Sequence, residues 1–322
     1  MTKLGYFTDL HLRSVSPIGR KDSFKEAVLT KFENIIDIFL CEGVDAIVFG
    51  GDFFHTYRVY DYDLLRRVIC ILETVAFSDI PFYTIVGQHD LAGYDPDSLS
   101  KSAFQFVISC STIQVLREPV IVGDVEIRPC HVYDDLVVRA KEKSKSSTSI
   151  LIAHKLISKI TRMFDVFITS DLNTENQLVL SGDLHAGVPL HEINGTQFFN
   201  PGAVARLSRD ETDMKRKPQI AVIECEKGGK IDVRPIFIPG VSSPDEVFKL
   251  DEDIPIMLEN TSIAGDFIEQ VRNLEKRVTD VFELVKKVGE KMGANEDVMN
   301  YIESKRAELQ IDNPAELVSD AE

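Results

Sequence analysis

Acidic, imidazole and amide side chains recur in this sequence directly after short runs of β-branched or aromatic residues. Five such segments occur in order, and they contain Asp9 and His11, Asp52, Gln88 and His89, His154, and Asp183 and His185. Four of the seven histidines of the chain fall within them. Ligands that follow neighbouring strands can meet at one edge of a sheet, so the pattern predicts a metal centre built on strand ends.

The spacing within two of these segments suits metal binding. Asp9 and His11 are two residues apart, so both side chains leave the same face of a strand end. Asp52 follows two glycines, where the backbone can turn tightly and let a metal approach. Carboxylate, imidazole and amide ligands suit Mn²⁺, Fe²⁺ or Zn²⁺, and Mg²⁺ less well. Two such ions, about 4 Å apart, would activate water for in-line attack on a phosphoester.

Each segment alone has a more ordinary explanation. Asp-x-His is more often a helix cap beside a surface histidine, and Gly-Gly-Asp is most often a turn. The metal interpretation therefore depends on the order of five strand-end segments within one α/β frame.

The elements that must position these residues alternate between strand and helix from Leu4 to Val86, which is typical of a layered α/β sheet with helical crossovers. The pair Asp22-Ser23 is expected to cap the first helix, and Ser98 a third one. The expected helices are residues 22–43, 61–76 and 98–110. The expected strands are residues 4–8, 44–49, 81–86, 113–116, 120–122, 125–129, 149–153, 177–180, 197–199, 219–224 and 231–239.

The sequence changes character after residue 240. Apolar residues recur at alternating spacings of four and three from Phe267 to Val288, which makes a heptad seam over three repeats. We therefore expect a main domain over residues 1–240, a linker over 241–261 and a C-terminal helix-loop-helix module over 262–322. The seam could pack against its own domain or bind a partner.

Composition narrows the class of protein. A formal net charge of −16 on 322 residues argues against nonspecific adhesion to nucleic acid, but allows an enzyme whose cations or basic partner supply the attraction. Five widely spread cysteines indicate reduced thiols in a cytoplasmic protein, or in a host cytoplasm if the source is viral. The chain has no long apolar run and opens without a secretory signal, so no membrane association is expected.

The five segments read Asp9-Leu10-His11, Gly51-Asp52-Phe53-Phe54-His55, Gly87-Gln88-His89-Asp90, His154 and Gly182-Asp183-Leu184-His185. In this order they resemble the motifs of calcineurin-like metallophosphoesterases, and the Gly-Asp-Phe-Phe-His form resembles the branch of SbcD-type nuclease subunits. The resemblance implies a β-sandwich flanked by helices and a two-metal phosphodiesterase that cleaves DNA as an exonuclease or endonuclease in repair and recombination. It also implies that the C-terminal module binds an SbcC-type, SMC-like ATPase or forms a homodimer.

The resemblance further assigns roles to residues of this chain. The first metal would be held by Asp9, His11, Asp52 and His185, and the second by Asp52, Gln88, His154 and Asp183. Catalytic roles fall to His89, which Asp90 would orient, and to His55 near the scissile phosphate, while Arg13, Asn200 and Arg206 would contact the substrate. His55 and the arginines could equally be packing or surface residues.

Two residues depart from the family pattern, which usually has Asn in place of Gln88 and His in place of Asp183. Both changes make the second site harder and more negative, so Mn²⁺ is expected there, with Mg²⁺ as an alternative to it, in preference to Zn²⁺. Two other functions stay open. The chain could be a phosphoesterase for small nucleotides or phosphoproteins, or a scaffolding subunit whose second metal site has degenerated.

Overall fold

Strand and helix alternate in the first third of the chain as the sequence predicts. The computed structural model describes residues 1–17, 19–159, 166–209 and 211–249, so the predicted module at 262–322 lies outside the described residues. The first elements are β1 (Thr2–Phe7), α1 (Phe24–Glu42), β2 (Ala46–Phe49), α2 (Tyr62–Phe77) and β3 (Phe82–Thr84). Their boundaries follow from capping: Ser23 accepts a hydrogen bond from the Glu26 amide at the start of α1, and Gly43 ends it in the left-handed conformation.

The middle of the chain contains more short elements than the sequence indicates. They are η1 (Gln88–Asp90), η2 (Pro96–Lys101), α3 (Ala103–Ser109), β4 (Ile113–Val115), β5 (Val120–Val122), β6 (Val125–Cys130), α4 (Leu136–Lys141), β7 (Thr148–Ala153), β8 (Ile157–Ser158) and β9 (Phe167–Ile168). The prediction that Ser98 caps a helix is wrong. Ser98 lies inside the 3-10 helix η2, and Ser102 caps α3 by accepting from the Gln105 amide.

The last described part of the chain supplies strands to two different sheets. It contains β10 (Leu178–Ser181), β11 (Val188–Ile193), β12 (Thr196–Asn200), α5 (Glu211–Lys215), β13 (Gln219–Cys225), β14 (Ile231–Phe237) and α6 (Pro244–Val247). Helix α6 belongs to the predicted linker, and its end packs on the domain because Val247 and Phe248 are buried. The Lys21 amide also donates to the Val247 carbonyl oxygen at 2.8 Å.

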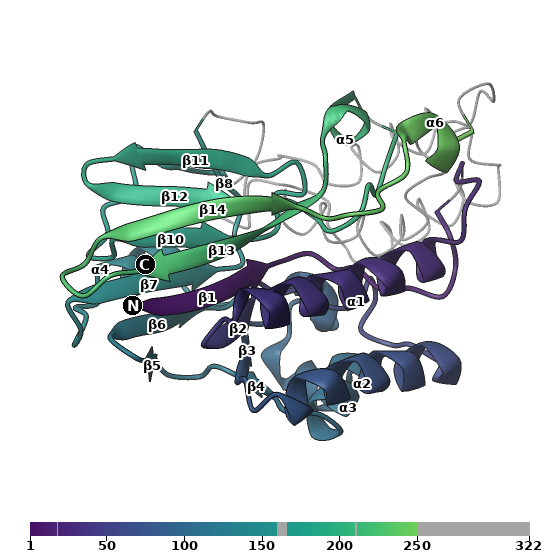
Figure 1. Ribbon diagram of the computed structural model, residues 1–322, viewed down its shortest axis with the longest axis horizontal. Helices are drawn as coiled ribbons and strands as arrows, with labels where there is room; N and C mark the ends of the chain where they lie inside the picture. Colours follow the sequence, from purple (N-terminus) through teal and green to yellow (C-terminus); the bar gives the residue numbers. More distant parts are fainter. Residues whose placement is uncertain (18, 160–165, 210, 250–322) are drawn as a thin grey trace, which may run out of the picture. The chain divides into compact units, whose positions relative to one another are not determined.

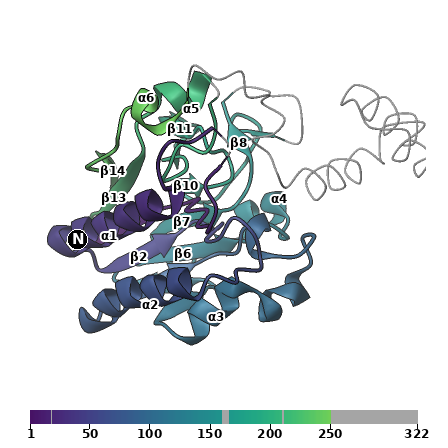
Figure 2. The same cartoon turned by 90° about the vertical axis from the view of Figure 1, so that its right-hand side faces the viewer.

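The described strands form two six-stranded sheets and a two-stranded one. The first sheet has the order β14-β13-β1-β2-β3-β4 and the second β11-β12-β10-β7-β6-β5. Helices α1 and α2 run side by side along one face of the first sheet (Figures 1 and 2). The predicted layered α/β fold, in which helices flank two sheets, is thereby confirmed over the described residues.

Alternation along β1 explains how the layers are held together. Leu4 and Tyr6 lie in the core between the two sheets, whereas Phe7 lies in the core beneath the helices. Gly5 also faces the helices, and a Cβ atom there would lie 2.6 Å from the Phe39 ring, so only glycine lets α1 approach this closely. Within the described part of the chain, no helix has both the length and the apolar character needed to cross a membrane.

Candidate metal centre

Parallel strand pairing brings the five segments to one region. Strand β1 pairs in parallel with β2 and β2 with β3, while β7 pairs in parallel with β10, so each group of ligand segments leaves its sheet in the same direction. Within the first group, the Asp9 amide donates to the Gly51 carbonyl oxygen at 3.1 Å. The two groups are joined where the Asp183 amide donates to the Asp9 carboxylate at 3.2 Å.

One set of four residues has the form of a metal site. The ligand atoms of Asp9, His11, Asp52 and His185 all lie within 4.8 Å of one another, and these are the residues that the resemblance assigns to the first metal. The Nε2 atoms of His11 and His185 face each other at 2.9 Å. Two imidazole lone pairs at this distance need a proton or a cation between them, so the set fits a bound metal ion.

The residues assigned to the second metal adjoin this set. Asp52 Oδ2 lies 3.3 Å from His154 Nε2, and Gln88 Nε2 donates to Asp183 Oδ1 at 2.6 Å. Three buried atoms of the set have no hydrogen-bond partner in the described part of the chain: Asp52 Oδ2, His154 Nε2 and Gln88 Oε1. Buried polar atoms are rarely left unpaired, so these oxygens and this nitrogen fit a second divalent cation.

The orientation of His154 supports that assignment. Its Nδ1 atom donates to the Gly50 carbonyl oxygen at 2.6 Å, which directs Nε2 toward Asp52. Burial alone would lower the pKa of His154, but the Asp52 carboxylate raises that pKa well above its ordinary value. A divalent cation would take the place of this proton, because a histidine binds a metal only through an unprotonated nitrogen.

Burial and neighbouring charges shift the pKa values of two other proposed ligands, His11 and Asp52. The side chain of His11 is buried, and this burial together with His185 lowers the pKa of His11 well below its ordinary value, so its imidazole is neutral. Burial opposes the ionisation of Asp52, but His154 and His89 outweigh it and hold the pKa of Asp52 below its ordinary value. The centre therefore pairs a neutral imidazole with an ionised carboxylate, as metal coordination requires.

Four proposed ligands have a strained backbone. The φ angles of Asp9, His11, Asp52 and Asp183 are 54°, 47°, 59° and 70°. Seven non-glycine residues in the described ranges have positive φ, and these are four of them. The left-handed conformation costs roughly 1–3 kcal/mol per residue and is concentrated at functional sites. Here it turns each ligand sharply out of its strand.

His89 and His55 lie beside the first ligand set. Their rings are stacked with centroids 5.2 Å apart, and the His89 ring lies 4.9 Å from that of His11. His89 Nδ1 donates to the His55 carbonyl oxygen at 2.7 Å, which fixes the ring tautomer. Burial and the nearby Arg13 lower the pKa of His55 to about 3, so that ring is neutral at physiological pH.

Asp90 does not hold the His89 ring, contrary to our expectation. Its carboxylate is fully buried and accepts hydrogen bonds from the backbone amides of Asp52, Phe53 and Gly87 at 3.1, 3.0 and 3.0 Å. The His55 carbonyl oxygen orients His89 instead. Asp90 therefore fixes the backbone that carries Asp52, a role that sequence spacing does not reveal.

The expected substrate residues are placed in three different environments. Arg13 lies near His55, with its guanidinium 5.0 Å from the centroid of the Phe24 ring. Asn200 is fully buried, and its amide donates to the Leu184 carbonyl oxygen at 3.1 Å, so it supports the loop that carries His185. The guanidinium of Arg206 donates to three backbone carbonyl oxygens, those of Asp213, Ser242 and Arg216, in a separate pocket.

Gly87 shapes the candidate site, although the motif alone assigns this residue no role. A Cβ atom at Gly87 would lie 2.1 Å from Asp52 Oδ1, so the loop before Gln88 can approach the Asp52 carboxylate only if this residue is glycine. The signal in the sequence is the glycine that precedes the ligand in three of the five segments.

Comparison with known proteins gives a family. Residues 2–187 match the family of calcineurin-like phosphoesterases. The chain is 29% identical over 236 residues to the DNA double-strand break repair protein Mre11 of Haloferax volcanii, and the match covers 66% of this chain and 48% of that protein. The chain thus spans about half the length of this curated relative.

Two solved structures match the chain at low sequence identity. A dimetal phosphatase from Danio rerio is 9% identical with a TM-score of 0.48, covering 74% of this chain and 98% of that one. The phosphoesterase Yfce from E. coli is 15% identical with a TM-score of 0.38, covering 74% of this chain and 100% of that one.

The family match includes all five ligand segments and more than half of the chain. It confirms the predicted membership of a family of metal-dependent hydrolases that act on phosphoester bonds. The chain belongs to the calcineurin-like phosphoesterase family, whose members use a two-metal centre.

Proposed function

We propose that this chain is a two-metal phosphodiesterase that cleaves DNA, as the nuclease subunit of an SbcC/SbcD-like complex for DNA end processing and repair. The observation that carries the proposal is the convergence of Asp9, His11, Asp52 and His185 within 4.8 Å, with the His89 ring beside them. The similarity to a DNA double-strand break repair protein supports DNA as the substrate.

The bound cations would polarise the phosphoester and lower the pKa of the attacking water. The Nδ1–H group of His89 donates to the His55 carbonyl oxygen. Nε2 is therefore the ring atom that would exchange a proton with the leaving oxygen. The neutral His55 ring stacks on His89 and positions it. Arg13, which lies near His55, would contact the substrate phosphate.

The identity of the metals follows from the ligand types. Asp183 supplies an anionic oxygen and Gln88 a neutral amide oxygen, which favour a hard cation in the second site. We therefore propose Mn²⁺, with Mg²⁺ as the alternative, in preference to Zn²⁺. Two bound cations would also offset part of the net charge of −16 that otherwise repels DNA.

The proposed partner is an SMC-like ATPase of the SbcC type. The heptad seam from Phe267 to Val288 has the spacing of a helix that packs on a coiled coil, and its position after the catalytic domain supports docking on the ATPase or homodimer formation.

A nuclease assay tests the proposed function. Linear duplex and single-stranded DNA are incubated with Mn²⁺ and with the wild type, His89→Ala or Asp52→Ala protein. We expect cleavage by the wild type and loss of about 100-fold or more in both variants, with metal binding retained only in His89→Ala. Cleavage that persists in Asp52→Ala would contradict the proposal.

One observation favours a non-catalytic scaffolding subunit as the second candidate. Gln88 and Asp183 are two of the four proposed second-metal ligands, and the hydrogen bond between them occupies one polar atom of each. This bond could hold the two side chains in place without an ion. If the second site stays empty in Mn²⁺ and DNA is not cleaved even with the partner ATPase, this candidate replaces the nuclease. Turnover of small nucleotides or phosphoproteins but not of DNA would instead indicate a phosphoesterase for small substrates.

A further inference from the structure

A pocket separate from the metal centre lies between α1 and the segment that follows β14. Its volume is about 350 Å³, which is within the range of small-ligand sites. The walls include Arg20, Lys31 and Arg206, together with residues 239–242. The pocket contains none of the residues assigned to the two metals, so ligand binding here is independent of the proposed nuclease function.

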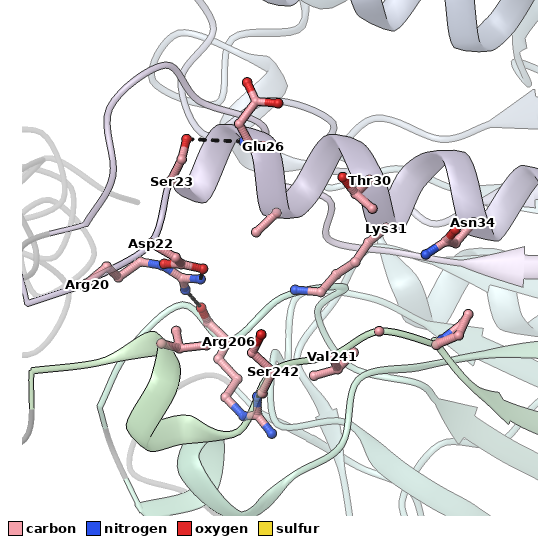
Figure 3. Close-up of a pocket in the computed structure, with 14 residues that line it drawn as sticks. Arg20, Asp22, Ser23, Glu26, Thr30, Lys31, Asn34, Arg206, Val241 and Ser242 are labelled. Atoms are coloured by element: carbon pink, nitrogen blue, oxygen red, sulfur yellow. Dashed lines mark hydrogen bonds and ion pairs between the residues drawn. The ribbon is translucent and has the colours of Figure 1, made fainter.

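Lys31 is the unusual residue of this pocket. Its side chain extends from α1 into the space opposite Ser242 (Figure 3), and the residue is only 8% exposed. No hydrogen bond or ion pair joins its ammonium group to another residue of the described chain. A buried, unpaired ammonium group is costly, and proteins normally pair such groups with an anion.

The neighbouring arginines, Arg20 and Arg206, add positive charge to the pocket, so they do not neutralise the ammonium group of Lys31. Arg20 is bound bidentately to Asp22 at 2.7 and 2.8 Å, and its third contact is the Arg206 carbonyl oxygen at 2.6 Å. The guanidinium of Arg206 contacts only carbonyl oxygens among the described residues. Both arginines are thus held rigidly, and their positive charges lie beside the ammonium group.

Acidic residues of the lining are already engaged. Asp22 is bound to Arg20, and Glu26 is bound to Arg67 at 2.7 and 2.8 Å. Three cationic and two acidic side chains therefore line the pocket. Of the cations, only Arg20 is bound to a carboxylate among the described residues, and Lys31 differs from Arg206 in having no hydrogen bond there either. The pocket has room for a group larger than a single carboxylate.

We propose that this pocket binds a small anion of the phosphate type, either free phosphate or the phosphate group of a mononucleotide, with Lys31 as the central ligand. The ammonium group offers three donors to phosphate oxygens. Each arginine retains N–H groups beyond the three that are bonded, and the hydroxyl groups of Thr30 and Ser242 lie in the lining. Binding would place a dianion beside three cations.

Calorimetry on the full chain tests the proposal. The metals are removed with a chelator, because phosphate also binds metal centres, and the protein is titrated with inorganic phosphate, thymidine 5′-monophosphate or acetate at constant ionic strength in chloride. We expect one phosphate site per chain in the wild type and affinity at least about tenfold weaker in Lys31→Met. Lys25→Met is the matched control, since Lys25 lies on the same helix but is bound to Asp61 at 3.1 Å.

The two phosphate arms distinguish the source of the ligand. Tighter binding of the nucleotide means that the sugar or base also occupies the pocket, whereas equal binding means that phosphate alone is recognised. The proposal is overturned if acetate binds as tightly as phosphate, if the wild type shows no binding above the chloride background, or if Lys31→Met binds phosphate like the wild type.

A second measurement needs no variant and covers the case in which Lys31→Met does not fold. Acylation of lysines in the metal-free wild type is followed by mass spectrometry with and without phosphate. Phosphate should protect Lys31 and leave Lys25 unprotected, whereas equal labelling of Lys31 in both conditions would overturn the proposal.

Discussion

Gln88 Nε2 donates a 2.6 Å hydrogen bond to Asp183 Oδ1, across 95 residues of sequence. The two positions at which the resemblance implies a departure from the family pattern are thus in direct contact. The contact orients the amide and leaves Gln88 Oε1 buried and without a hydrogen-bond partner in the described residues. The two substitutions are therefore structurally coupled, since the anionic Asp183 accepts from the amide whose oxygen is left to coordinate a cation.

This coupling predicts a change of metal preference. The double variant Gln88→Asn/Asp183→His introduces a nitrogen donor, so the ratio of Zn²⁺ to Mn²⁺ affinity should rise by about tenfold or more. Metal titration with elemental analysis measures the ratio, and DNA cleavage in each metal measures the consequence. Tighter Zn²⁺ binding together with faster turnover in Zn²⁺ for the wild type would contradict the proposed preference.

Asp90 should be essential for stability and for metal affinity, although it is not expected to coordinate a metal. Its carboxylate accepts from three backbone amides, and Asn would offer one oxygen and a repelling NH₂ group. We expect Asp90→Asn to lower the free energy of unfolding by roughly 3 kcal/mol and to weaken metal binding, because Asp52 loses its backbone support.

Urea unfolding and Mn²⁺ titration check this prediction. Asp95→Asn is the control, because Asp95 is an exposed helix cap and Asn is an equally good cap, so its cost should be under about 1 kcal/mol. Equal stability of the two variants would show that the buried carboxylate does not hold the loop.

The C-terminal module should be separable from catalysis. Deleting residues 262–322 should abolish co-purification with the ATPase partner, because the heptad seam is the proposed docking helix. Metal-dependent phosphodiesterase activity on a small substrate should remain, since the proposed ligands lie between Asp9 and His185. Retained association would mean that the partner binds elsewhere.

Local signals made the clustering of the candidate ligands and the first helices predictable. The cap residues Ser23 and Gly43 act on neighbouring backbone, and each ligand follows an apolar strand, so adjacent residues carry the information. Parallel pairing of the strands then brings the ligands together without further specification in the sequence.

Long-range contacts explain what the sequence did not reveal. Asp90 bonds to amides 37 and 38 residues away, and Arg206 donates to a carbonyl oxygen 36 residues away. A motif shows which side chains can do chemistry, but not which backbone groups they meet in the folded chain. Asp90 and Asn200 were therefore expected to act on substrate or catalyst, whereas the structure shows them supporting the backbone.

Lys31 predicts an unusual pH dependence of stability. Burial and the nearby Arg20 lower the pKa of Lys31 from 10.5 to about 8, and Arg206, Arg216 and Asp22 are the other charged groups that act on it. Below pH 8 the group is protonated in both the folded and the unfolded chain, so the full cost of the buried charge, about 3 kcal/mol, is present. As the pH rises from 8 to 10.5, the folded chain releases the proton before the unfolded chain does, and the cost disappears.

The stability difference between Lys31→Met and the wild type isolates this effect, because every other titrating group is common to both proteins. Without phosphate, we expect Lys31→Met to be more stable at pH 7 and the difference to narrow toward pH 10, as measured by urea unfolding. Saturating phosphate should narrow the difference at pH 7 as well, because it stabilises only the wild-type pocket. If the stability difference between the two proteins stays constant with pH, burial does not lower the pKa of Lys31.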